Sequence, residues 1–179
     1  MQIKLTESLS LEPITMDSYD ELCQLMERIY PPAYKYLWDD DGQWYLQHMY
    51  NKTNVKLDIE EENSVFYFVN FHNIKSGILK LQYGSPYPDM PTKKALRLHR
   101  IYLSEEVQGK GISGSIMDYV LNLANQQEAE IVWLDCMDTK EQALRYYMKH
   151  GFQKGTLSQL EYELLHKDKR GIYLMWKEM

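Results

Sequence analysis

Long apolar runs are missing from this sequence. No stretch approaches the roughly 18 consecutive apolar residues that a membrane-spanning helix needs, and the opening MQIKLTESLSLEPI lacks the apolar core of a signal peptide. Gly/Ser-rich linkers, internal repeats and low-complexity tracts are absent as well. We therefore expect one domain over residues 1–179, without a membrane partner.

Cysteine is scarce. The two cysteines, Cys23 and Cys136, lie far apart, and neither a CxxC motif nor a Cys/His cluster occurs. A disulfide framework and a metal site are therefore not expected, and a reducing cytoplasm is the default location. Both side chains are expected to be buried and to pack as apolar groups.

Positive charge is in deficit: 20 Lys and Arg stand against 26 Asp and Glu, which gives a net charge of −6. A nucleic-acid surface needs the opposite sign, so no nucleic-acid partner is expected. Most of the excess acid lies in residues 1–95. This acidic half is compatible with a cationic amine as substrate, but a solvated surface that aids solubility is the simpler interpretation.

Hydrophobic periodicity predicts an α/β (α+β) domain with a mixed sheet of about seven strands and about four helices. The expected strands cover residues 9–14, 64–71, 75–83, 96–103, 130–137, 152–164 and 171–177. The expected helices begin at Asp17, follow Gly42, and cover residues 111–126 and 141–150.

A glycine-dense turn lies between the strand 96–103 and the helix that follows it. It reads Gln108, Gly109, Lys110, Gly111, Ile112, Ser113, Gly114. Glycine lets the main chain approach a ligand, and a helix N-terminus offers free N–H groups to phosphate. The glycine spacing also matches a dinucleotide fingerprint, with Asp135 downstream as a ribose-binding acid. Three consecutive strands precede the turn and too little chain follows it for a doubly wound sheet, so we favour this reading less.

Two motifs together resemble the GNAT superfamily of N-acetyltransferases. The family's cofactor motif, (Gln/Arg)-x-x-Gly-x-(Gly/Ala), is matched by residues 108–113, with Ser113 at the last position. The second signature runs from Asn-x-x-Ala to aromatic-Tyr-x-x-x-Gly-Phe, and residues 140–152 match it with Lys140 in place of Asn. The resemblance covers about residues 9–178. It implies a mostly antiparallel sheet with a V-shaped splay between the fourth and fifth strands, and acetyl transfer from acetyl-CoA to an amine.

The resemblance also implies which residues hold the cofactor. The pyrophosphate would bind the N–H groups of residues 109–114, with Lys110 adding charge, and the pantetheine arm would lie along the strand at residues 101–103. The expected cofactor-binding set is Ile101, Tyr102, Leu103, Gln108, Gly109, Lys110, Gly111, Ile112, Ser113, Gly114 and Lys140.

Three residues are candidates for the chemistry. Tyr147 matches the family tyrosine that protonates the leaving thiolate, although it could be a packing aromatic. Asp135 is a candidate base, or else the partner of a cation such as Arg100. His99 is predicted by strand alternation to share a face with Ile101 and to point into the slot, as a base or as a structural histidine. A water chain could also carry the proton.

The acceptor is a small-molecule amine or a protein or peptide amine. Aromatic residues from Tyr34 to Tyr45, with Asp39–Asp41, could form a rim for a cationic amine, or the rings could simply be buried. No cysteine lies in either motif, so we expect direct attack in a ternary complex. A non-catalytic acyl-CoA-binding module is the alternative, and the resemblance also suggests a homodimer.

Overall fold

The computed structural model describes residues 2–179. Its centre is one eight-stranded sheet in the order β1-β2-β3-β4-β5-β6-β8-β7. Neighbouring strands are antiparallel except for β5 and β6, which are parallel. The strands are β1 (Ile3–Lys4), β2 (Leu9–Pro13), β3 (Ser64–Phe71), β4 (Ile74–Tyr83), β5 (Ala95–Leu103), β6 (Ile131–Met137), β7 (Gln153–Gln159) and β8 (Gly171–Glu178). The predicted mixed sheet is confirmed, with one additional strand, because the two-residue β1 is too short to produce a periodic pattern.

Five α-helices flank the sheet, one more than the sequence predicted. They are α1 (Tyr19–Tyr34), α2 (Gln43–Met49), α3 (Lys52–Glu60), α4 (Ile112–Gln126) and α5 (Glu141–Lys149). The unpredicted helix is α3, which buries only Val55 and so carries almost no amphipathic signal. Asn51, the residue before it, is the N-cap: its side chain accepts a hydrogen bond from the Asn54 N–H at 2.9 Å.

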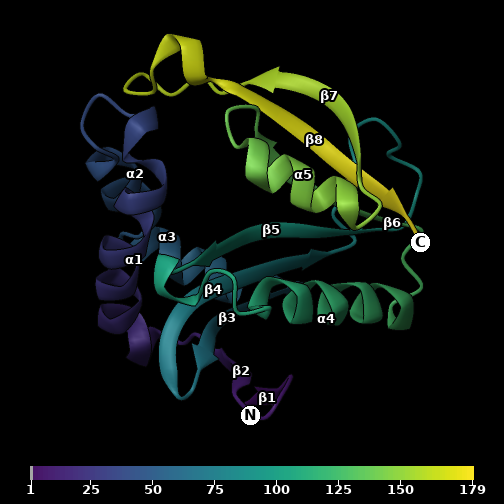
Figure 1. The fold of residues 1–179 in the computed structure, drawn as a ribbon, viewed down its shortest axis with the longest axis horizontal. Helices are drawn as coiled ribbons and strands as arrows, with labels where there is room; N and C mark the ends of the chain where they lie inside the picture. The colour runs from purple at the N-terminus through teal and green to yellow at the C-terminus, as the bar shows by residue number, and fades with distance from the viewer. Residues whose placement is uncertain (1) are drawn as a thin grey trace.

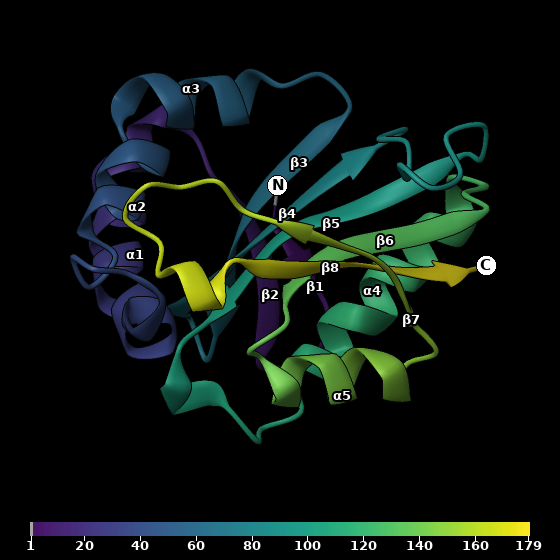
Figure 2. The ribbon, with the colours of Figure 1, turned by 90° about the horizontal axis from the view of Figure 1, so that it is seen from above.

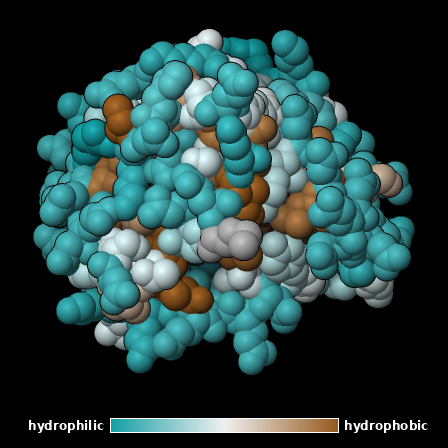
Figure 3. All heavy atoms as spheres, turned by 90° about the horizontal axis from the view of Figure 1, so that it is seen from below, coloured by the Kyte–Doolittle hydropathy of each residue, from teal (hydrophilic) through white to brown (hydrophobic). Residues whose placement is uncertain are grey.

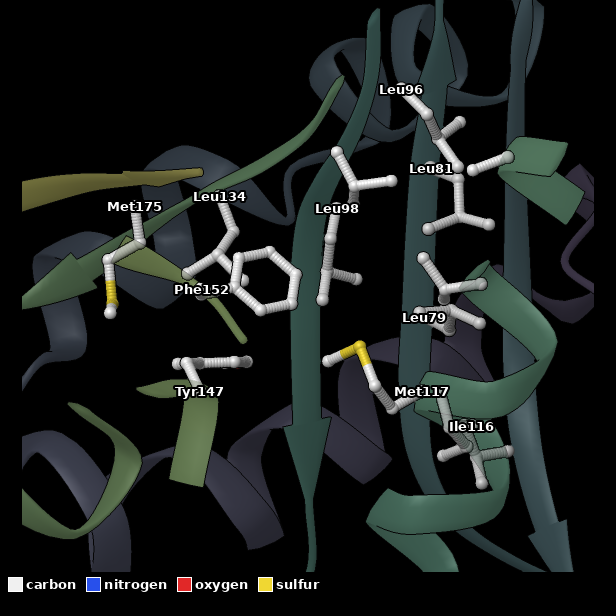
Figure 4. Close-up of a cluster of buried hydrophobic side chains, with 14 of the residues drawn as sticks. Leu79, Leu81, Leu96, Leu98, Ile116, Met117, Leu134, Tyr147, Phe152 and Met175 are labelled. Atoms are coloured by element: carbon white, nitrogen blue, oxygen red, sulfur yellow. The ribbon is translucent and has the colours of Figure 1, made fainter. Parts of the chain in front are cut away.

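The helices cover opposite faces of the sheet. α4 and α5 pack on one face with the larger hydrophobic cluster, while α1, α2 and α3 pack on the other with a second cluster (Figures 1 and 2). Figure 4 shows Phe152 beside Leu98, with Tyr147 below Phe152, and Met117 and Ile116 of α4 below Leu79. Strand β3 alternates between the clusters, because Phe68 belongs to one and its neighbours along the strand to the other.

The sheet splits between β5 and β6. Their parallel pairing ends at Leu98 and Leu134, although β5 continues to Leu103 and β6 to Met137. In Figure 1 the half of the sheet with β7 and β8 diverges from the half with β4 and β5 toward the left of the view. These strands are the fourth and fifth of the seven predicted ones, so the expected V-shaped splay is confirmed.

A β-bulge lies at the start of the splay. Lys80 pairs with Arg100 and Leu81 pairs with Leu98, so His99 is the additional residue on β5. The bulge shifts the alternation by one, and Leu98 and Ile101 consequently pack into the same cluster. The alternation argument that placed His99 therefore fails, although His99 does reach the cavity described below.

The face seen from below is mostly hydrophilic, with hydrophobic residues in small separate patches (Figure 3). Among the helices of residues 2–179, none is both long and apolar enough to cross a membrane.

Candidate active site

The glycine turn leaves β5 and begins α4, as predicted. Val107 and Ile112 are buried at its two ends, whereas residues 108–111 are exposed. Gly109 and Gly111 adopt φ angles of 74° and 75°, in the left-handed region that favours glycine. The first intrahelical bond runs from the Ser115 N–H to the Gly111 carbonyl at 3.2 Å. The N–H groups of residues 112–114 therefore have no acceptor within the helix and can bind an anion.

The edge of β5 beyond Leu98 has no β partner on the β6 side within residues 2–179. Ile101, Tyr102 and Leu103 pair with β4 on their other side. An extended ligand can add to such a free strand edge through main-chain hydrogen bonds. The splay thus offers open backbone next to the exposed glycine turn.

A cavity of about 400 Å³ lies at the splay. Its walls come from the strands β5, β6, β7 and β8, from α1, α2 and α5, and from the connection between β7 and β8. All three candidate catalytic residues, Tyr147, Asp135 and His99, line it, so the fold brings together residues that are far apart in the sequence.

Tyr147 projects from α5 and is 9% exposed. Its ring packs edge-on against Phe152, with 5.7 Å between ring centroids, and against Tyr146, with 5.4 Å. Burial raises the pKa of Tyr147 well above its ordinary value, and the neighbouring Cys136 contributes to the same direction. The phenol is therefore protonated at neutral pH. Tyr146 does not line the cavity.

Asp135 lies just beyond the last β5–β6 pair, and its Oδ2 accepts a hydrogen bond from the Arg97 guanidinium at 2.5 Å. The expected ion pair is thus present, with Arg97 rather than Arg100, because Arg100 binds Asp58. The Arg97 guanidinium also stacks over the Trp133 ring, 4.4 Å from its centroid. The second oxygen of Asp135 has no hydrogen-bond partner within residues 2–179.

His99 is neutral in this setting. Burial is the main reason that its pKa falls to about 3, and the cations Arg100, Arg97 and Lys80 lower it further. Its Nδ1 is buried without a hydrogen-bond partner in the described part of the chain. A histidine whose protonated form is so disfavoured is a weak base, but it can still donate or accept a hydrogen bond.

Lys140 contacts α1. Its Nζ donates a hydrogen bond to the Ala33 carbonyl and lies over the rings of Tyr34 and Tyr36, 4.3 and 5.2 Å from their centroids. A cation at the C-terminal end of a helix is favoured by the helix dipole. Lys140 therefore joins the start of α5 to the end of α1, and it still lines the cavity.

Stacked tyrosine rings form the wall on the α1 side. Tyr30 stacks on Tyr34 and Tyr45, at centroid distances of 4.9 and 4.5 Å, and the Tyr45 and Tyr102 hydroxyl groups lie 2.9 Å apart. The acidic run Asp39–Asp41 does not line this cavity. Asp40 instead accepts hydrogen bonds from two N–H groups at the start of α2, and Asp39 lies 2.8 Å from His166. Of the aromatic residues expected in the rim, Tyr34, Trp38 and Tyr45 line the cavity, whereas Tyr36, Trp44 and the acidic part do not.

The connection between β7 and β8, residues 160–170, forms the remaining wall; we call it the strap. The sequence predicted a strand as far as residue 164, whereas β7 ends at Gln159. The strap crosses toward α2 before returning to β8 (Figure 2). Its main chain exchanges hydrogen bonds with residues 37–39, from the Asp39 N–H to the Leu164 carbonyl and from the His166 N–H to the Leu37 carbonyl, each 2.9 Å long. These long-range backbone hydrogen bonds hold the strap in place, and Tyr162 on the strap lines the cavity.

Comparison with known proteins decides the family. Residues 19–152 match the family model described as acetyltransferase (GNAT) family. The chain belongs to the GNAT family. It is accordingly an N-acetyltransferase whose cofactor is acetyl-CoA, as the motifs implied.

Solved structures share the whole fold of this GNAT protein at low sequence identity. RimL, a ribosomal L7/L12 alpha-N-protein acetyltransferase in complex with coenzyme A, is 16% identical, with a TM-score of 0.72 over 100% of this chain and 98% of that one. PaiA N-acetyltransferase from Thermoplasma acidophilum, in complex with coenzyme A, is 13% identical, with a TM-score of 0.71 over 96% and 99%. A spermidine N-acetyltransferase SpeG variant from Vibrio cholerae is 13% identical, with a TM-score of 0.67 over 97% and 95%.

The residues present fit acetyl-CoA. The free N–H groups at the start of α4 suit a pyrophosphate, and the free edge of β5 suits the extended pantetheine arm. The side chain of Ile112 is buried in the core, so this residue can contribute only its backbone.

Several cavity residues carry no sequence signal. Arg97 looks like an ordinary strand cation, and Cys136 like an apolar filler, until the structure places both in the wall. Burial raises the pKa of the Cys136 thiol to about 12, so the thiol is protonated and a poor nucleophile. Tyr162 lies on the strap, where the sequence predicted a strand. These residues come from separate elements, and only long-range packing brings them together.

Proposed function

We propose that this protein transfers the acetyl group of acetyl-CoA directly to a primary amine held in the cavity, in a ternary complex. The observation that supports the proposal is the cavity at the β5–β6 splay, whose lining includes Tyr147, Asp135 and the free end of β5 that precedes the glycine turn. Bound acetyl-CoA supplies an acetyl thioester. The protonated thiol of Cys136 supports direct attack rather than an acyl-enzyme.

We assign Tyr147 as the general acid. Its raised pKa keeps the proton on the phenol at neutral pH, which is the state that a donor to the leaving sulfur needs. The cofactor groups would be the loop 108–114, the backbone of residues 101–103 and Lys140.

We assign Asp135 as the better candidate for the base. It keeps one carboxylate oxygen free, whereas the lowered pKa of His99 makes that imidazole a weak proton acceptor. His99 then serves as a neutral hydrogen-bonding group in the wall. The proposed acceptor is an amine of either source, small molecule or peptide, including the small cationic amines that the acidic first half suggested.

The test is Tyr147→Phe, with Tyr146→Phe as the matched control because Tyr146 does not line the cavity. Release of CoA from acetyl-CoA is measured with a panel of amines, and CoA binding by calorimetry. We expect Tyr147→Phe to reduce kcat by about 10²–10⁴-fold and to leave CoA affinity unchanged. If the unaltered protein binds CoA but no amine releases it, the chain is a binding module and the proposal is wrong.

A further inference from the structure

The cavity is closed on one side by the strap. Main-chain hydrogen bonds to residues 37–39 hold the strap in place, and Lys169 Nζ adds a 2.8 Å hydrogen bond to the Tyr36 carbonyl. The cavity volume of about 400 Å³ lies at the lower end of the range for small-molecule sites. This size favours a small acceptor over a segment of a folded protein.

The charges in the wall do not suit a cation. The charged side chains that line the cavity are Arg97, Arg100 and Lys140 on the positive side and only Asp135 on the negative side. Asp135 is already paired with Arg97, and Arg100 is paired with Asp58 from outside the cavity. Lys140 has no carboxylate within 4.0 Å in residues 2–179, so the wall and its partners carry an excess positive charge.

Two buried polar atoms in the same wall lack partners. Arg97 uses one terminal nitrogen for Asp135 and the other for Gln82, but its Nε is buried without an acceptor in the described residues. His99, two residues along β5, has its buried Nδ1 in the same condition. A buried donor without an acceptor is costly, and the Arg97 Nε–H is such a donor; the His99 Nδ1 is a second one in the tautomer that carries the proton there. The wall is therefore complementary to a ligand that brings an acceptor group.

We propose that the acceptor of this acetyltransferase is a small amine that also carries a carboxylate, and that Arg97, with His99 beside it, binds this carboxylate. The free oxygen of Asp135 then remains for the amine end of the same molecule, so the Arg97–Asp135 pair presents both signs of charge to a zwitterion. An α-amino acid has this chemistry, whereas a polyamine does not. The inference rests on the proposed transfer to an amine.

The experiment compares matched acceptors with the unaltered protein and acetyl-CoA, following CoA release. Phenylalanine is compared with phenylalaninamide, which has the same shape without the negative charge, and with phenethylamine; ornithine is compared with putrescine. We expect kcat/KM for each acid to exceed that of its neutralised or decarboxylated analogue by about tenfold or more, as for a charge-assisted hydrogen bond. The amine of phenylalaninamide is less basic than that of phenylalanine, so more of the amide is present as the reactive free base. This difference favours the amide and therefore cannot produce the expected preference for the acid.

Arg97→Gln should abolish most of this preference, reducing the ratio of acid to analogue toward one. Because the readout is a ratio, a general loss of activity does not imitate it. Arg145→Gln is the matched control, since this guanidinium is exposed on α5 and pairs only with Glu141 there; the ratio should not change. If Arg97→Gln does not fold, the comparison of acceptors with the unaltered protein still tests whether a carboxylate on the acceptor is recognised.

Failure of this inference differs from failure of the proposed function. Equal or faster acetylation of the amide, phenethylamine or putrescine would overturn the carboxylate inference while confirming amine acetylation. Absence of CoA release with every amine, although CoA still binds, would overturn the proposed function itself.

Discussion

Asp58 is the carboxylate whose removal should destabilise this fold most clearly. It lies on α3, and its two oxygens bind different cations: Oδ1 binds Lys80 of β4 and Oδ2 binds Arg100 of β5. The side chains of Lys80 and Arg100 are only 1% and 6% exposed. Asp58→Asn therefore leaves two buried cations without their shared counter-charge.

The expected loss can be bounded from these contacts. Removing one partner from a buried ion pair costs about 3–5 kcal/mol, because the remaining charge stays desolvated. Lys80 retains Glu61 as a partner, whereas Arg100 has no other carboxylate within 4.0 Å in residues 2–179, so a value near the lower limit, about 3 kcal/mol, is expected. For a chain of this size the melting temperature should fall by about 6–12 °C.

Urea unfolding at pH 7 measures this loss, and Asp118→Asn, a substitution at an exposed position on α4, is the control. The pH dependence adds a second check. Burial alone would raise the pKa of Asp58, but Arg100 and Lys80 outweigh it and hold the pKa below the ordinary value of 3.8. The stabilisation is therefore complete above that value and is lost as the pH falls through the lower folded-state pKa, so the two proteins should converge in acid. A loss below about 1 kcal/mol at pH 7 would refute the reasoning.

Two further predictions concern the cofactor side of the cavity. Gly111→Ala forces a side chain into the left-handed region at a cost of about 1–2 kcal/mol, so the CoA affinity measured by calorimetry should fall about tenfold. Gly114→Ala is the control and should leave the affinity nearly unchanged, because φ is not positive there and an added Cβ meets nothing within 4 Å. Equal losses of affinity in the two variants would contradict the backbone explanation. A Cys136 thiol with a pKa of about 12 has an ionised fraction of roughly 10⁻⁴ at pH 8. Mass spectrometry should therefore find it alkylated by iodoacetamide far more slowly than a free cysteine. Rapid alkylation would show that the thiol is exposed to solvent rather than buried in the cavity wall.

Most of the fold could be read from local pattern. The alternating and apolar runs predicted every strand except β1, and four of the five helices were expected. The helix α3 was missed because one buried residue gives no periodicity. Helix α1 contains Pro31 and Pro32 and still continues to Tyr34; proline's fixed φ of about −65° is a helical value, although each proline removes one N–H donor.

The candidate site was only partly predictable. The sequence named Tyr147, Asp135 and His99, and the structure brings all three to one cavity. Arg97 could not have been chosen over Arg100 as the partner of Asp135, because the bulge at His99 and the end of β5–β6 pairing set which guanidinium reaches it.

The sequence by itself determined the glycine turn, the start of α4 and the position of Tyr147 relative to Gly151-Phe152. These depend on backbone preferences and side-chain spacing within a few residues, which the order of amino acids specifies directly. Only the tertiary structure decided the character of the cavity: the neutral state of His99, the Arg97–Asp135 pair and the exclusion of Asp39–Asp41. Each of these depends on which distant groups share a buried, low-dielectric space, and that is a property of packing rather than of local sequence.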